Sequence, residues 1–245
     1  MNLNYISLGL DYNTYISVDN DLRYDFQQHI DFINDFFSKE IRKKKFKTDG
    51  TFNMINIALS EFELKPSSIV PSKVLQVHLD FDKKVYEKAK ETEDYNYYLE
   101  LLEKGFKKAN KIKSIPLDEL LNLIERFKKS NYKNKWIHKK KRFKKDDLEV
   151  ILTCELTTNY FQLWLTVNRI TTNELLINEV VIRTETGISI HEGMFKDIII
   201  ENDIIITDKS DSPRIIISKK AILDKELIFE INGDSEIKEI LSYEL

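Results

Sequence analysis

The sequence predicts an α+β fold, with an N-terminal mainly helical region that holds a few strands and a C-terminal antiparallel β-meander or sandwich. In the first half, apolar residues recur mostly at the three- and four-residue spacing of a helix. After residue 145 they alternate with polar residues, as in half-buried strands. The 245 residues include only six Gly and four Pro and no linker-like stretch. We therefore expect a helical region over residues 1–145 and a β region over residues 146–245, packed as one unit.

The N-terminal region is expected to begin with a short hairpin and to continue mostly as helices. Residues 4–10 and 14–19 each alternate briefly between apolar and polar side chains, which predicts the hairpin. Residues 21–41 follow the helical spacing, and Asp19 or Asn20 is available to cap that helix. Two strands, at residues 52–64 and 73–82, and two further helices follow. The buried faces of those helices are predicted to comprise Tyr95, Tyr98, Leu99, Leu102 and Phe106 in the first and Leu117, Leu120, Leu121, Ile124 and Phe127 in the second.

The C-terminal region contains seven strand-like runs separated by short, turn-rich sequences. Their spacing of about ten residues favours antiparallel pairing over a parallel βαβ arrangement. The predicted strands cover residues 148–156, 161–168, 174–183, 196–202, 203–208, 214–219 and 226–232.

Positive charge is concentrated in one basic segment, Arg126–Lys145. Eleven of its twenty residues are Lys or Arg and none is acidic, although the whole chain has a net charge of −3. The net charge is +13 between Lys104 and Lys145, −5 over the residues before and −11 over the residues after. A local field of this kind attracts anions whatever the total charge.

Three interpretations of the basic segment remain open. In the first, the lysines are a solvated face and the aromatic residues turn inward, because Trp136 and Phe143 are seven residues apart, as on one face of a helix. In the second, the segment docks an acidic protein. In the third, it binds nucleic acid through phosphate contacts and base stacking. The candidate partner-binding residues are Tyr132, Trp136, His138, Lys139, Lys140, Lys141 and Arg142.

Two constellations could hold a metal ion. His78, Asp80 and Asp82 alternate along a predicted strand, and imidazole and carboxylate groups both suit divalent metals. The simpler alternative is that these three side chains face water while Val77, Leu79 and Phe81 face the core.

The second constellation is Asp49 with Glu63 and Lys65, which are spaced as in PD-(D/E)xK nucleases. In that pattern two carboxylates bind Mg²⁺ and the lysine orients the attacking water. Since E-x-K triplets arise often by chance in a chain with 32% charged residues, this pattern supports only a subsidiary hypothesis.

Other features favour a binding protein that lacks a cofactor and catalytic activity. The sequence has no G-x-G-x-x-G, P-loop, G-x-S-x-G or H-E-x-x-H motif. The single cysteine, Cys154, suits a reducing compartment, and its alternating surroundings predict a buried side chain. The N-terminus does not read as a signal peptide, and no apolar run is long enough to span a membrane. We therefore expect a cytoplasmic protein with no membrane partner.

Three stretches resemble uncharacterised bacterial proteins encoded beside polymorphic toxins, whose role is immunity. They are YNYYLELLEKGFKKANK, IPLDELLNLIERF and NKWIHKKKRFKKDDLEVILTCELTTNYFQLWLTV, together spanning Tyr95–Val167. The resemblance implies a protein that binds a cognate toxin domain and blocks its active site without turnover. It also implies that the acidic C-terminal half would face a cationic toxin, or the basic segment an acidic one. A nucleic-acid-binding protein is the alternative, and a metal-dependent nuclease ranks behind it.

Overall fold

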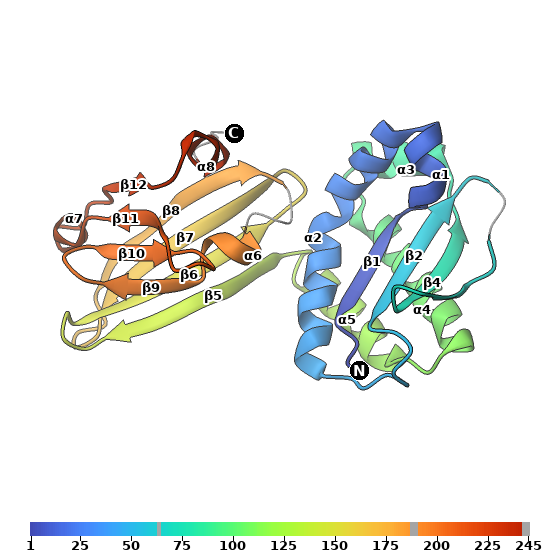
Figure 1. Ribbon diagram of the computed structural model, residues 1–245, viewed down its shortest axis with the longest axis horizontal. Coiled ribbons are helices and arrows are strands. Elements are labelled where there is room, and N and C mark those ends of the chain that lie inside the picture. The colour runs from blue at the N-terminus through green and yellow to red at the C-terminus, as the bar shows by residue number, and fades with distance from the viewer. Residues whose placement is uncertain (63–64, 187–190, 242–245) are drawn as a thin grey trace. The chain divides into compact units, whose positions relative to one another are not determined.

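The computed structural model describes residues 1–62, 65–186 and 191–241, and it confirms the predicted α+β class (Figure 1). The chain divides into two compact units, Met1–Lys133 and Asn134–Leu245, which we call unit 1 and unit 2. This division lies before the expected boundary at residue 145. The reason is that the basic segment contains both the end of the last helix of unit 1 and the first strand of unit 2.

Unit 1 contains a four-stranded sheet in the order β1-β2-β4-β3. The first three of these strands are parallel, and β3 is antiparallel to β4. The strands are β1 (Tyr5–Leu10), β2 (Met54–Ser60), β3 (Ser68–Val70) and β4 (Val74–Asp80). The helices are α1 (Tyr12–Val18), α2 (Asn20–Lys44), α3 (Lys83–Glu91), α4 (Tyr95–Ile112) and α5 (Leu117–Lys129).

The long predicted helices of unit 1 are confirmed. Asp19 caps α2 by accepting a hydrogen bond from the Leu22 amide, 3.0 Å away, and the predicted apolar stripe of α2 is buried. Helix α4 packs on β4 and β2. It approaches β2 closely at Gly105, where an added Cβ would lie 2.2 Å from the Ile57 Cδ1. A larger residue at this position would force the Ile57 side chain to move.

The predicted hairpin at residues 4–19 is wrong, because its second half is helix α1. Asp11 follows β1 directly, and its carboxylate accepts hydrogen bonds from the Thr14 amide at 2.9 Å and the Thr14 hydroxyl at 2.7 Å. This cap satisfies a free amide at the helix start. In addition, α1 buries the Tyr15 ring. The local cap and one buried side chain therefore override the weak alternation of the sequence.

Helix α2 closes the open edge of the sheet in unit 1. Among the strands that the structure describes, β1 has a neighbour on one side only. Along its other side, the Asn34 side chain accepts from the Leu8 amide at 2.9 Å and donates to the Leu8 carbonyl at 3.0 Å. Ser38 does the same for Ile6, at 3.0 and 3.1 Å. One helical turn and two strand residues both advance by about 6 Å, so side chains four apart on α2 match residues two apart on β1.

Unit 2 contains two antiparallel meanders, in the orders β5-β6-β7-β8 and β12-β11-β10-β9. All seven predicted C-terminal strands are present, and β5 precedes them. The strands are β5 (Asn134–Phe143), β6 (Leu148–Leu156), β7 (Tyr160–Arg169), β8 (Leu175–Glu185), β9 (Asp197–Ile200), β10 (Ile204–Thr207), β11 (Pro213–Ile217) and β12 (Phe229–Ile231). Short helices α6 (His191–Met194), α7 (Lys219–Leu223) and α8 (Ser235–Leu241) complete the unit.

The two meanders of unit 2 pack as a sandwich (Figure 1), and most of its buried side chains are aliphatic. Alternate residues of β6 are completely buried, including the single thiol, Cys154. The Phe161 ring of β7 and the Phe195 ring, just before β9, lie parallel with their centroids 6.3 Å apart. Five isoleucines of the second meander, at positions 198, 204, 206, 215 and 217, are completely buried as well.

We predict that the contact between α2 and β1 contributes strongly to the stability of unit 1. The Asn34→Ala and Ser38→Ala variants should each lose about 1–3 kcal/mol, because each leaves backbone groups of an edge strand without partners. Hydrogen exchange of the β1 amides should accelerate in both. The control is Gln28→Ala, at an exposed position of α2, which should change neither stability nor exchange. Unchanged exchange at Ile6 and Leu8 in the two test variants would contradict the assignment.

Candidate partner-binding surface

The basic segment does not form the helix that the spacing of Trp136 and Phe143 suggested. Helix α5 ends at Lys129, and the rest of the segment is mostly edge strand β5. A bulge at His138 interrupts its pairing with β6, since Ile137 pairs with Thr153 and Lys139 with Leu152. The extra residue shifts the alternation, which explains why the strand period is hard to see in the sequence. Trp136 is half-buried and pairs with Cys154.

The charges of β5 face carboxylates of the same unit. Lys139 and Lys141 share Asp197, at 3.0 and 2.7 Å from its two oxygens. Lys140 and Arg142 share Glu149, at 3.1 and 3.5 Å. These contacts, which join β5 to β9 and to β6, hold the four predicted binding cations in internal ion pairs.

The other two predicted residues, His138 and Tyr132, also make contacts within their own units. The His138 Nε2 lies 2.5 Å from the Phe195 carbonyl. Tyr132 belongs to unit 1, where its hydroxyl donates to Asn96 at 3.1 Å and its ring lies 5.9 Å from that of Phe127. The predicted set therefore spans the two units.

The lysines of β5 have a structural explanation. An edge strand exposes unpaired amide and carbonyl groups that can pair with another chain, and proteins protect such edges with Lys residues and bulges. Strand β5 has both features, in the form of its cationic side chains and the His138 bulge. Its composition fits the protection of a sheet edge as well as it fits a docking site.

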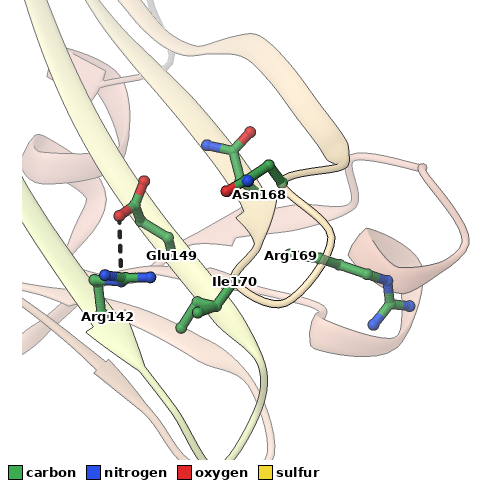
Figure 2. A pocket seen from close by; sticks show the side chains of 6 residues that line it. Arg142, Glu149, Asn168, Arg169 and Ile170 are labelled. Carbon is green, nitrogen blue, oxygen red and sulfur yellow. Dashed lines mark ion pairs between the residues drawn. The ribbon is translucent and has the colours of Figure 1, made fainter.

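A cavity of about 230 Å³ opens beside the end of β5, where the turn between β7 and β8 lies (Figure 2). Its two arginines already face carboxylates: Arg142 lies 3.5 Å from Glu149 and Arg169 lies 3.5 Å from Glu174. Figure 2 shows the Arg169 side chain pointing away from Arg142, so the two guanidinium groups do not converge on one ligand. The full lining comprises Arg142, Glu149, Asn168, Arg169, Ile170 and Asn173.

The nuclease pattern is not assembled. Asp49 precedes β2 and Lys65 follows it, and a seven-residue strand separates its ends by about 20 Å. Asp49 pairs with Lys113 at 2.6 Å, whereas Lys65 pairs with Asp11 at 3.2 Å. The third member, Glu63, lies outside the described residues.

The other metal constellation is also separated. His78 is 5% exposed, so the expectation that it faces water is wrong. Asp80 is exposed at the end of β4, and Asp82 caps α3 by accepting from the Lys84 amide at 2.9 Å. Among the residues that the structure describes, no three His, Cys, Asp or Glu side chains come together as a metal site.

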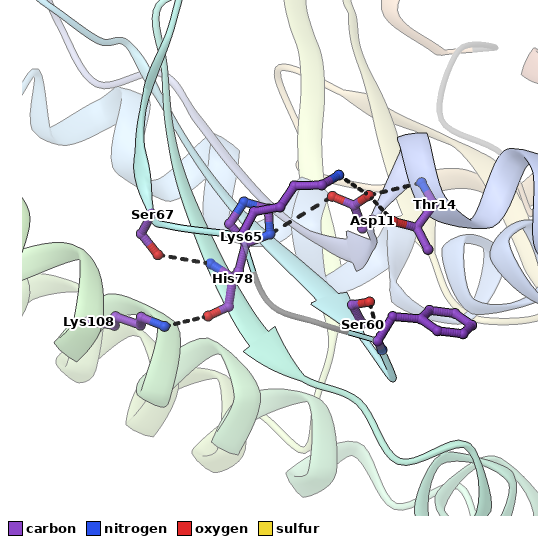
Figure 3. A network of polar contacts seen from close by, with 8 residues as sticks. Asp11, Thr14, Ser60, Lys65, Ser67, His78 and Lys108 are labelled. Atoms are coloured by element: carbon purple, nitrogen blue, oxygen red, sulfur yellow. Dashed lines mark hydrogen bonds and ion pairs between the residues drawn. The ribbon is translucent and has the colours of Figure 1, made fainter.

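Figure 3 shows the polar network that fixes α1 at the carboxyl end of the parallel strands. Asp11 is almost completely buried at the end of β1, where it binds Thr14 and Lys65 and lies 3.9 Å from the His78 Nδ1. Burial tends to raise the pKa of Asp11, but the hydrogen bonds from Thr14 and Lys65 outweigh it and lower the pKa. Burial lowers the pKa of His78 despite the nearby carboxylate.

The buried tyrosine of α1 provides a second anchor. The Tyr15 hydroxyl accepts from the Glu61 amide at 3.2 Å and lies 3.4 Å from the Glu61 carboxylate. Burial raises the pKa of Tyr15 to about 12, so the hydroxyl stays neutral. Because α1 is short and directs only Tyr15 into the core, its other large side chains are left on the surface.

An exposed apolar surface results, which we call the α1 surface and define by Tyr12, Ile16, Arg23 and Tyr24. Tyr12 is 58% exposed, Ile16 46% and Tyr24 54%, and Arg23 is half-buried among them. The Arg23 guanidinium lies over the rings of Tyr12 and Tyr24, which joins α1 to the first turn of α2. The ion pair between Lys83 and Asp19, at 3.1 Å, brings the start of α3 alongside (Figure 1).

Sequence reasoning missed the α1 surface because its residues resemble core residues. Tyr12 falls in the turn of the predicted hairpin and Ile16 in its second strand, and Tyr24 lies in the sequence between Leu22 and Phe26 of the apolar stripe of α2. The one available signal was Asp11 with Thr14, which is an N-cap pattern. A helix starting there would have placed Tyr12 and Ile16 together, four residues apart, on one face.

Comparison with protein-family models gives no match, and comparisons with curated proteins and with solved structures give none either. Within the described part of the chain, no helix has the length and apolar character needed to cross a membrane. The candidate surface therefore rests on its geometry.

We predict that Asp197 stabilises unit 2 through its two lysines. Burial tends to raise its pKa, but hydrogen bonds from Lys141 and Lys139 outweigh burial and hold the pKa at about 2, below the ordinary value of 3.8. This contribution is present above about pH 4 and is lost as the pH falls toward 2. Asp197→Asn should cost about 1–2 kcal/mol at neutral pH, allowing for solvent screening. Urea unfolding at neutral pH and near pH 2 measures the difference in unfolding free energy between the variant and wild type. This difference should shrink at the lower pH; a constant difference would contradict the stabilising role of Asp197.

We also predict that His78 makes unit 1 less stable in mild acid. Its folded pKa lies below the ordinary value of 6.5, so protonation favours the unfolded chain, and stability falls as the pH drops through this value. The slope should be at most about 1.4 kcal/mol per pH unit. Replacing the ring by a neutral amide, His78→Gln, should flatten the change in unfolding free energy between about pH 7 and pH 5. Equal slopes in the variant and wild type would show that His78 is not responsible.

Proposed function

We propose that the protein is a non-catalytic, immunity-type protein of the bacterial cytoplasm that binds a cognate toxin domain and blocks the toxin's active site. The observation that carries this proposal is the α1 surface. Large exposed apolar side chains gathered in one place indicate an interaction site, whereas scattered ones do not. Tyr and Arg are also the residue types most enriched in the energetically dominant centres of protein interfaces.

The ion pairs that the basic segment makes within unit 2 further favour protein binding over nucleic-acid binding. Nucleic-acid binding would need cations that are free to neutralise phosphates. In β5, however, Lys139 and Lys141 pair with Asp197, and Lys140 and Arg142 pair with Glu149. Releasing these lysines would cost internal ion pairs, so the nucleic-acid alternative has less support than protein binding.

The test uses the protein encoded by the gene adjacent to this chain's gene, which the proposal expects to carry the toxin domain. Co-expression should protect cells from that domain, and the two proteins should co-purify. Tyr24→Ala should weaken binding by about 1–2 kcal/mol, because truncating a central aromatic anchor has an effect of this size. Calorimetric titration of the purified proteins measures the change.

The matched control is an isoleucine pair. Ile16→Ala changes the α1 surface, whereas Ile228→Ala removes a similarly exposed isoleucine of unit 2. Only the first should weaken binding. A protein that neither binds the neighbouring toxin domain nor protects the cells would refute the proposed function.

A further inference from the structure

We infer that the α1 surface receives an acidic side chain of its protein partner, with the carboxylate bound by Arg23 and with apolar partner groups seated on the tyrosines and Ile16. This inference rests on the proposed function, since it specifies the chemistry of the partner at the same surface. Three features of Arg23 support it: its guanidinium is held in place, no carboxylate of the described residues pairs with it, and its surroundings are apolar.

Arg23 is fixed in place before any partner binds. Its guanidinium carbon lies 4.2 Å from the ring centroid of Tyr24 and 5.1 Å from that of Tyr12. Its Nε donates to the Asn20 side chain at 3.0 Å, and its Nη1 lies 3.5 Å from the Gln27 side-chain oxygen. Neutral amides and aromatic faces thus orient the cation without neutralising it. An arginine ordered in advance loses less side-chain entropy when it binds.

The charge of Arg23 is not balanced by a carboxylate. No acidic group of the described residues lies within ion-pair distance of it, and its Nη2 makes no hydrogen bond to them. Two neighbouring acids have other partners: Asp19 accepts from Leu22 and pairs with Lys83, and Asp25 binds Tyr86 and Lys90. Asp21 is exposed two residues away on α2, a spacing that points it to a different side of the helix.

The apolar surroundings indicate a protein segment. Tyr12, Ile16 and Tyr24 are each about half exposed, and burying them requires apolar groups that a free phosphate does not provide. Arg binds a carboxylate through two parallel hydrogen bonds, and excluding water around the pair strengthens them. The matching partner element is therefore an Asp or Glu flanked by aromatic or large aliphatic residues.

Selection of random peptides displayed on phage against the purified full-length protein provides the probe. The enriched peptides should share an Asp or Glu beside an aromatic or aliphatic residue. Fluorescence anisotropy of one synthetic peptide should show at least about tenfold weaker binding to Arg23→Ala. The affinity of the Arg23→Lys variant for this peptide should lie between those of wild type and Arg23→Ala, because lysine keeps the charge but not the planar stacking. The control Arg126→Ala, whose native arginine pairs with Glu40 at 2.9 Å, should bind within about twofold of wild type.

A second peptide, with the carboxylate replaced by its amide, completes a double-mutant cycle. It should bind wild type as weakly as the original peptide binds Arg23→Ala, and it should lose nothing further on that variant. Enrichment of basic or uncharged peptides, or equal binding of the acid and amide peptides, would overturn the inference.

The outcomes for toxin neutralisation are distinguishable from these. If Arg23→Ala still protects cells with full affinity for the toxin domain, the proposed function stands and this inference fails. If peptides bind through Arg23 while wild type gives no protection, the proposed function fails and the chemistry of the surface stands.

Discussion

The alignment of α2 along β1 is the contact on which unit 1 depends. Two polar side chains of one helix satisfy the amides and carbonyls that would otherwise make β1 an open edge. The match works only when the helix runs beside the strand in one register, because the two advance together by about 6 Å. The contact therefore fixes the position of α2 along β1, whereas the Asp19 cap sets the residue at which the helix begins. Since Arg23 and Tyr24 lie in its first turns, sheet-edge pairing also determines the position of the candidate surface.

The two units protect the exposed edges of their sheets in different ways. In unit 1 a helix supplies the missing hydrogen bonds to β1. In unit 2, β5 remains at the edge and carries a row of cations and a bulge, which disfavour pairing with another chain. The basic segment that dominates the sequence is thus explained largely by local architecture. The α1 surface, which is inconspicuous in the sequence, is where exposed apolar groups have no such explanation.

The sequence predicts those parts of the fold in which one periodicity persists. The stripe of α2 and the seven C-terminal strands repeat their patterns long enough to be recognised. Prediction fails where one local contact decides the outcome. The cap that Asp11 provides turns residues 12–18 into a helix, and the extra residue at His138 disguises a strand. The α1 surface could not be predicted for a third reason. Tyrosines such as Tyr12 and Tyr24 are common in protein cores, and only the packing around Tyr15 shows that these two lie outside the core.

The distribution of chromophores gives each unit its own optical signal. Both tryptophans, Trp136 and Trp164, and the single thiol of Cys154 belong to unit 2, whereas nine of the eleven tyrosines belong to unit 1. Indole fluorescence and thiol labelling therefore follow the opening of the sandwich, and phenol absorbance follows mainly the unit that carries the α1 surface. The unmodified chain can thus show whether a ligand acts on one unit or on both.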